Sequence, residues 1–335
     1  MIELKHDRLM FSFPEVHADA ACSVEFQRTL RIPDDDTDYP LPPGLGRFPV
    51  RHVDDAGERA PDSWRTRGGV MLPMYQSEAL WLNFSSPNGY PFALKIAAGK
   101  INAVNGDTWS NVLRGDRQDY VVIPDQPWLD GYYVEDGCVR QFVAMPLGSG
   151  YSAEEQLTGR AEHGGIQLLA FPLKAEVWER MKRRKGRHER VHESIALSDV
   201  MVACDMGLAP GGRMKQQIYD DRREFSDWDT ETHARCFVHI ANSLVWRQVT
   251  GEQPPTVPPT ATEYASAGLP WFDYYDEAQL PLSAGDGLGG LKSVTQLGQE
   301  KGDNPLPEND SVEVSDEVIV KLKKERETGV REGKW

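Results

Sequence analysis

Tight-turn dipeptides in the first half of the chain limit the ways in which it can fold. Asn88-Gly89, Asn105-Gly106 and Asp136-Gly137 each adjoin short runs of apolar residues. Such pairs adopt the left-handed backbone conformations that two-residue hairpin turns need. The last of them separates Tyr-Tyr-Val-Glu from Cys-Val-Arg-Gln-Phe-Val-Ala-Met, which is the pattern of a hairpin tip. Because hairpins join antiparallel strands, the chain is expected to form antiparallel sheet rather than repeated βαβ units.

Residues 24–32 show the alternation of a strand with one buried face. Even-numbered positions there are Val, Phe, Arg, Leu and Ile, whereas odd-numbered positions are Glu, Gln, Thr and Arg. Side chains of a strand point alternately to its two faces, so a period of two predicts a strand. The following segment, 33–49, holds five prolines and two glycines and is therefore expected to be a loop.

The clearest helical pattern lies at 229–250. Apolar residues recur there at helical spacing, and Gly251 with Pro254-Pro255 supplies a stop signal. A shorter helix is predicted after the capping box that Ser152 forms with Glu155, and another over 174–185. The expected fold class is α+β: a mainly antiparallel, sandwich-like β-sheet with one long amphipathic helix, 229–250, packed on it.

The composition changes after residue 275. Residues 277–314 are rich in Gly, Pro, Asp and Ser, with isolated leucines and valines between them. We expect one β-rich globular domain over 1–275 and an extended C-terminal arm over 276–335, with a short helix at 316–327. The apolar residues of the arm need a surface on which to be buried. That surface is expected to belong either to the same chain or to a neighbouring subunit, and the second case would give a homo-oligomer with exchanged arms.

Charge and cysteine content restrict the class of partner and the compartment. The net charge of −15 opposes attraction to phosphates and anionic lipids, so nucleic acid is an unlikely partner and no membrane association is expected. The N-terminus has no apolar segment typical of a signal peptide, and no run of 18 apolar residues occurs. The four cysteines are far apart in sequence and lie in apolar runs, which is typical of reduced, buried thiols. A cytoplasmic location is therefore expected.

One metal-site motif is present. His188-Glu189-Arg190-Val191-His192 matches H-E-x-x-H, in which two histidines one helical turn apart bind zinc and the glutamate activates water. The flanks are strongly basic, and guanidinium groups beside the histidines would repel a cation. A solvated basic helix end is the preferred interpretation, with His188 and His192 as zinc ligands and Glu189 as catalytic base the alternative.

Two further segments suggest ligand contacts. Residues 207–214, Gly-Leu-Ala-Pro-Gly-Gly-Arg-Met, approach the phosphate-binding loop pattern but lack its lysine and hydroxyl residue. They are expected to form a glycine-rich turn, which could expose Arg213 and Lys215 to an anion. In the acidic loop, Asp34, Asp36 and Asp38 have the spacing of calcium ligands without the required glycine and glutamate, so a solvated loop is expected there.

Aromatic residues gather in three short segments, around Trp81, around Trp128 and after Leu269. Trp and Tyr beside polar residues near strand ends are suited to line a cleft for flat ligands or a partner, although β-cores use them too. The candidate ligand-binding residues are Trp128, Asp130, Tyr132, Arg213, Lys215 and Trp271.

No nucleophile elbow and no kinase motif occurs. The sequence therefore predicts a non-catalytic protein that binds a ligand or a protein partner, or assembles with itself through the C-terminal arm, without a cofactor. The alternative is a zinc-dependent hydrolase that uses the motif at 188–192.

Overall fold

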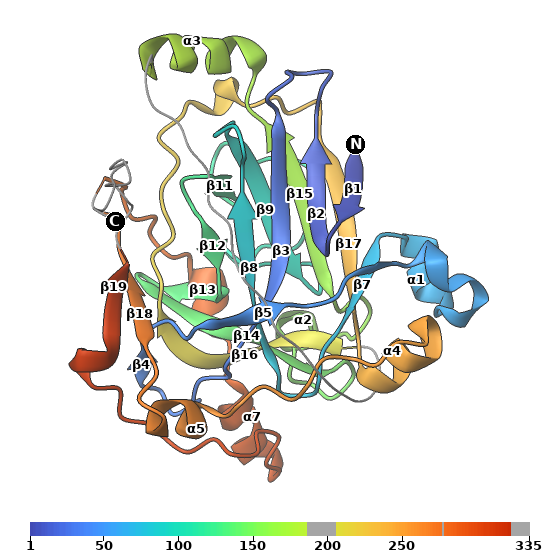
Figure 1. The fold of residues 1–335 in the computed structure, drawn as a ribbon, viewed down its shortest axis with the longest axis vertical. Coiled ribbons are helices and arrows are strands. Elements are labelled where there is room, and N and C mark those ends of the chain that lie inside the picture. Colours follow the sequence, from blue (N-terminus) through green and yellow to red (C-terminus); the bar gives the residue numbers. More distant parts are fainter. Residues whose placement is uncertain (186–205, 277, 323–335) are drawn as a thin grey trace, which may run out of the picture.

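The computed structural model describes residues 1–185, 206–276 and 278–322 (Figure 1). Strands hold 35% of the residues and helices 20%, so the fold is α+β with β-structure dominant, as the sequence predicts. Most strand pairs are antiparallel. None of the helices in these ranges combines the length and apolar character needed to cross a lipid bilayer.

The larger sheet contains ten strands in the described part of the chain. Its main path runs β1-β2-β3-β8-β14-β16-β4, and three short strands pair beside it. The Asp136-Gly137 turn joins two of its strands as predicted, with Glu135 opposite Cys138 and Gly137 at φ 74°. The strands are β1 (Ile2–Lys5), β2 (Arg8–Ser12), β3 (Ala21–Thr29), β4 (Asp38–Tyr39), β5 (Gly44–Arg47), β8 (Ala79–Ser85), β12 (Trp128–Leu129), β13 (Gly131–Glu135), β14 (Cys138–Pro146) and β16 (Met206–Lys215).

The second sheet has the order β10-β9-β15-β17-β7-β6, with β11 paired to β9. One hydrophobic cluster takes side chains from both sheets, for example Val24 and Leu82 from the larger and Leu94 and Leu168 from the smaller. The two sheets therefore share a core. The strands are β6 (Arg51–His52), β7 (Val70–Pro73), β9 (Phe92–Ala98), β10 (Ile101–Asn102), β11 (Val121–Ile123), β15 (Ile166–Pro172) and β17 (Ala234–Ala241).

Two short helices lie where the sequence predicts them. Ser152 and Glu155 form the capping box of α2, and Gly159 ends that helix in the left-handed conformation. The helix predicted at 174–185 is α3, which packs Val177 and Trp178 into the core. The helices are α1 (Asp62–Arg67), α2 (Ala153–Thr158), α3 (Ala175–Lys185), α4 (Ser243–Thr250), α5 (Ala261–Ser266), α6 (Asp286–Gly289) and α7 (Val294–Lys301), with 3-10 turns at Asp54–Arg59, Phe225–Asp227 and Asp316–Val318.

The single long helix predicted over 229–250 is wrong. Within this range, Ala234–Ala241 form strand β17, which pairs with both β15 and β7, and only Ser243–Thr250 is helical. Cys236, Val238 and Ile240 alternate into the core, and β-branched and aromatic residues favour a strand that has neighbours on both sides. Asn242 then caps α4 through its side chain, and Gly251 ends the helix as predicted.

The glycine-rich turn predicted at 207–214 is also wrong, because the segment lies within β16. Its glycines serve close packing. A Cβ on Gly211 would lie 2.5 Å from Cγ2 of Val143, and one on Gly212 would lie 2.3 Å from the carbonyl oxygen of Pro33. The two glycines thus allow a loop and a neighbouring side chain to approach the strand.

The C-terminal arm packs on the body of its own chain. Leu288 and Leu291 join the shared core, and Leu297 joins a cluster with Val143 of β14. The arm holds more regular structure than predicted, namely α6, α7 and β19 (Ile319–Leu322), which pairs in parallel with β18 (Trp271–Tyr274). The helix predicted at 316–327 is replaced by a 3-10 turn and β19 up to residue 322, and residues 323–327 lie outside the described ranges.

A polar contact fastens the arm to the acidic loop. Asp34 is buried, and its Oδ2 accepts a hydrogen bond of 2.8 Å from the backbone of Thr295 in the first turn of α7. Its Oδ1 lies 3.5 Å from the guanidinium of Arg140, and Asp36 is 3.0 Å from the same group. These carboxylates thus face an arginine and a helix amino end rather than a shared cation.

The strand assignment of 234–241 gives a test. Ile240→Ala should lower the free energy of unfolding by roughly 2–5 kcal/mol, because Ile240 lies in the core, whereas Arg235→Ala should change it by less than about 0.5 kcal/mol. Urea unfolding followed by circular dichroism measures both values. Similar values for the two variants would contradict the alternation of β17.

Candidate functional site

Two of the predicted ligand-binding residues belong to the core. Tyr132 and Trp271 are fully buried. The hydroxyl of Tyr132 donates to the carbonyl of Leu208 at 2.9 Å, and Trp271 packs against Tyr39 and Tyr264. In this structure both side chains anchor strands and face no open surface.

Arg213 and Lys215 lie near the end of β16 and do not form a cradle. Arg213 donates to Asp38 at 2.6 Å and to Glu135 at 2.8 Å. These hydrogen bonds raise the pKa of the guanidinium further, and the two carboxylates balance the positive charge that would attract an anion. Lys215, which follows Arg213 by two positions in β16, is exposed.

Trp128 and Asp130 do come together, because Trp128 begins β12 and Asp130 lies between β12 and β13. Asp130 is buried, and Gln216 pairs with it twice: the amide donates to Oδ2 at 2.8 Å, and its oxygen accepts from the Asp130 backbone at 2.9 Å. Burial raises the pKa of Asp130 to about 7, against the lowering effect of hydrogen bonds from Trp128 and Gln216. No charged side chain contributes to this shift. Asp130 is therefore a buried carboxyl group that titrates near neutral pH.

Trp128 belongs to a row of partly exposed aromatic rings. Its ring centroid lies 4.8 Å from that of Tyr274 and 6.4 Å from that of Trp81. The three rings come from β12, β18 and β8, and all are half-buried. Sequence reasoning singled out Trp128 but did not place the other two beside it, because their meeting depends on the pairing of β12 with β8 and on the position of β18.

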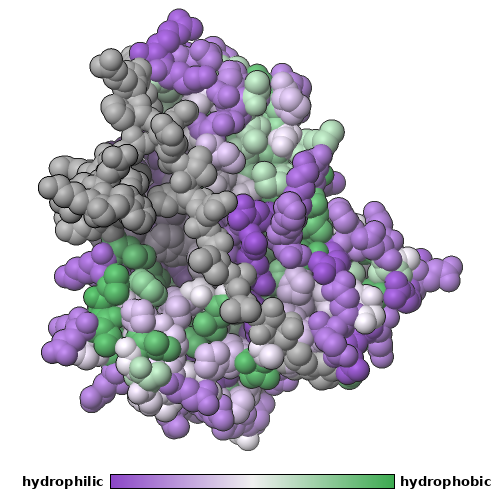
Figure 2. All heavy atoms as spheres, in the orientation of Figure 1, coloured by the Kyte–Doolittle hydropathy of each residue, from purple (hydrophilic) through white to green (hydrophobic). Residues whose placement is uncertain are grey.

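The row continues across the small sheet at the end of the chain. In the parallel register of β18 and β19, Phe272 lies opposite Val320 and Tyr274 opposite Leu322, so all four side chains share one face. Val320 is 44% and Leu322 is 38% exposed. Figure 2 shows hydrophobic atoms gathered at the left of the view, where Figure 1 places β18 and β19. We call this surface the aromatic face; it consists of Trp81, Trp128, Phe272, Tyr274, Val320 and Leu322.

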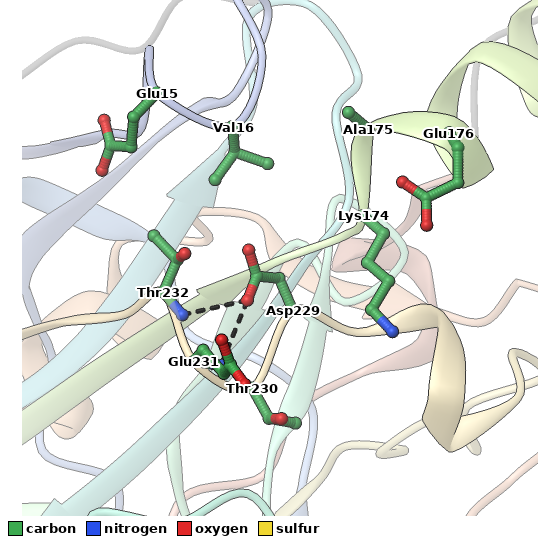
Figure 3. Close-up of a pocket in the computed structure, with 9 residues that line it drawn as sticks. All are labelled: Glu15, Val16, Lys174, Ala175, Glu176, Asp229, Thr230, Glu231 and Thr232. Atoms are coloured by element: carbon green, nitrogen blue, oxygen red, sulfur yellow. Dashed lines mark hydrogen bonds between the residues drawn. The ribbon is translucent and has the colours of Figure 1, made fainter.

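An open pocket of about 500 Å³ lies elsewhere, between the loop after β2, the start of α3 and the loop before β17 (Figure 3). Glu15, Glu176, Asp229 and Glu231 line it. Asp229 accepts hydrogen bonds from the backbone of Glu231 and Thr232, while Glu15 and Glu176 stand apart from it on opposite sides of the view in Figure 3. The carboxylates do not converge, so the pocket does not have the geometry of a metal site.

The predicted zinc alternative remains a prediction. His188, Glu189 and His192 lie outside the described residues. Within the described ranges, no group of three or more His, Cys, Asp or Glu side chains is placed to hold a metal ion.

Comparison with known proteins gives no further guide to the site. No family model matches the chain, and no curated protein or solved structure is similar to it.

The raised pKa of Asp130 predicts a specific pH dependence of stability. The unfolded carboxyl titrates near pH 4, whereas the folded one titrates at about 7, so the folded state loses stability as the pH rises between these values. Asp130→Asn removes this loss. The unfolding free energy of the variant minus that of the wild type should increase by roughly 3–4 kcal/mol from pH 4 to pH 8. Urea unfolding at several pH values measures this difference, with the half-buried Asp273→Asn as control. A difference for Asp130→Asn that does not change with pH would contradict the assignment.

Proposed function

We propose that this protein is a non-catalytic binding protein and that it recognises a protein partner through the aromatic face. The observation that supports this is the continuity of partly exposed aromatic and aliphatic side chains from β8 across β12 and β18 to β19. Trp and Tyr are the residues that most often supply binding energy in protein interfaces. Contiguous exposed apolar surface of this kind marks interaction sites on soluble proteins.

The two sheets beneath the aromatic face favour a preformed site. We infer that the two large sheets pack in a sandwich-like arrangement, since side chains of both contribute to one core. Such a support would hold Trp81 and Trp128 in place before a partner arrives, which lowers the entropy cost of binding. Asp125, whose charge acts on Tyr274, pairs with Arg223 at 2.8 Å. Specificity would then come mainly from the shape of the apolar side chains.

Site-specific photocrosslinking in the native cell tests the proposal. A photoreactive phenylalanine analogue is placed at Val320 on the face, and in a matched control at Leu244 of α4, which is 46% exposed and lies away from the face. We expect one discrete crosslinked protein from position 320 and none from position 244. Leu322→Asp or Tyr274→Ala, added to the position-320 protein, should lower the yield about tenfold or more, as expected for loss of an anchoring contact.

Thermal unfolding of each variant checks that it remains folded. A product of twice the chain mass would identify the partner as a second copy and would support the proposal. The absence of a discrete product, equal products from both positions, or a yield that Leu322→Asp and Tyr274→Ala leave unchanged would refute it.

A further inference from the structure

Three side chains at the start of α4 are buried and have polar atoms without partners. Asn242, Ser243 and Trp246 are 0%, 1% and 0% exposed. Asn242 Nδ2, Ser243 Oγ and Trp246 Nε1 have no hydrogen-bond partner in the part of the chain that the structure describes. A buried donor without an acceptor costs free energy, so three of them in one helical turn require an explanation.

The helix geometry brings these donors together. Asn242 is the N-cap, and its Oδ1 accepts a hydrogen bond of 2.9 Å from the backbone of Val245, which leaves only the amide nitrogen free. Ser243 is the first residue of the helix. Trp246 follows Asn242 by four positions and Ser243 by three, so it lies on their side of the helix. Side chains lean toward the amino end of a helix, so those of Ser243 and Trp246 are directed toward the end at which Asn242 lies.

Within the described residues, backbone N–H groups at the start of α4 are further unpaired donors. The N–H groups of the first helical residues have no intrahelical acceptor. The backbone N–H groups of Ser243 and Leu244 have no acceptor among the other described residues either. The aligned peptide dipoles also give the amino end of the helix a partial positive charge. The site therefore combines hydrogen-bond donors with a favourable potential for negative charge.

The balance of donors and acceptors decides between a water molecule and an anion. The free groups of the amide, the indole and the backbone are donors only, and the hydroxyl of Ser243 is the single group that could also accept. A water molecule would bring two hydrogens that need acceptors, whereas an anion brings only lone pairs. Trp246 belongs to a buried hydrophobic cluster that includes Val53, Ala56 and Trp64, and a dry setting strengthens charge-assisted hydrogen bonds.

We infer that the amino end of α4 is an enclosed binding site for one small inorganic anion. Asn242 Nδ2, Ser243 Oγ, Trp246 Nε1 and the free backbone N–H groups hold it. Because the three side chains are almost completely buried, an ion held by them would be enclosed, which favours one of the size of chloride or bromide over a large organic anion. In Figure 1 the site lies on α4 beside α1, away from the aromatic face, so this inference does not depend on the proposed function.

Thermal unfolding in two sodium salts tests the site. The full chain is compared in sodium chloride and in sodium isethionate at equal ionic strength, since isethionate is too large for an enclosed site. Chloride binding to the folded state should raise the Tm by roughly 2–4 °C in excess chloride. Trp246→Phe, which removes the indole N–H and keeps an aromatic ring, should lose most of this shift. Thr250→Ala removes a hydroxyl from the other end of the same helix and should keep it.

Asn242→Asp gives the sharpest test. Aspartate is as good an N-cap as asparagine, so the bond to Val245 is kept. Its second oxygen would take the place of the anion and accept from the free donors. We expect Asn242→Asp to raise the Tm in isethionate and to abolish the chloride response. If the donors do not form an anion site, a buried carboxylate there will instead lower the Tm.

Crystals grown in sodium bromide locate the ion by anomalous scattering. Bromide at the amino end of α4 in the wild type, and none there in Asn242→Asp, is the expected result. Equal Tm values in the two salts, an unchanged chloride response in Asn242→Asp, or bromide only at other positions would overturn the inference.

Discussion

β14 pairs with β8, β13 and β16, so three strands take their positions from it. Its longest partner is β16, and the register of the two shifts between Arg140 and Phe142. Near this irregularity, Gly211 leaves room for Val143 and Gly212 leaves room for the loop at Pro33. The β14–β16 pair thus positions the acidic loop, the arm that packs on Val143, and, through Gln216, the buried carboxyl of Asp130.

Buried charges tie loops to this framework. Arg28 and Glu78 form an ion pair of 2.8 Å in which both side chains are 2% exposed. Arg28 also donates to the carbonyl of Thr256 in the segment after α4. Lys95 likewise pairs with Asp119 at 2.7 Å and donates to the carbonyl of Val112. Burying two charges yields little net stability, but leaving one unpaired is costly, so each pair favours one placement of its loop over others.

Local signals in the sequence suffice to predict those elements whose structure is decided within a few residues. The hairpin at Asp136-Gly137 and the capping box at Ser152 depend on turn and cap chemistry, and both are present. The segment 234–241 was different, because its apolar residues fit a helical stripe as well as a strand. Its pairing with β15 and β7, which are distant in sequence, decides the matter.

In the candidate site, too, some features follow from local sequence and others from contacts between distant segments. The sequence points to Trp128 and Asp130 because aromatic and acidic residues stand together near a strand end. Their neighbours Tyr274 and Gln216 are far away in sequence, and only the fold brings them into contact. Likewise, the donors at Asn242 and Trp246 have helical spacing, but their lack of acceptors depends on what packs around them. Sequence patterns thus indicate which groups are suited to binding, while burial and pairing decide which remain available.

The protein has a net charge of −15, so an anion site requires that attraction by nearby donors outweighs repulsion by the protein as a whole. The overall charge repels every anion, but in physiological salt its influence decays over about 8 Å. The amino end of α4 acts at hydrogen-bond distance in an apolar setting, where screening is weak. Salts of equal ionic strength screen the long-range repulsion equally, and the part of their difference that Asn242→Asp abolishes reports whether the anion fits the enclosed site. Selectivity by anion size would therefore arise from the contacts at Asn242, Ser243 and Trp246 and not from the charge of the protein as a whole.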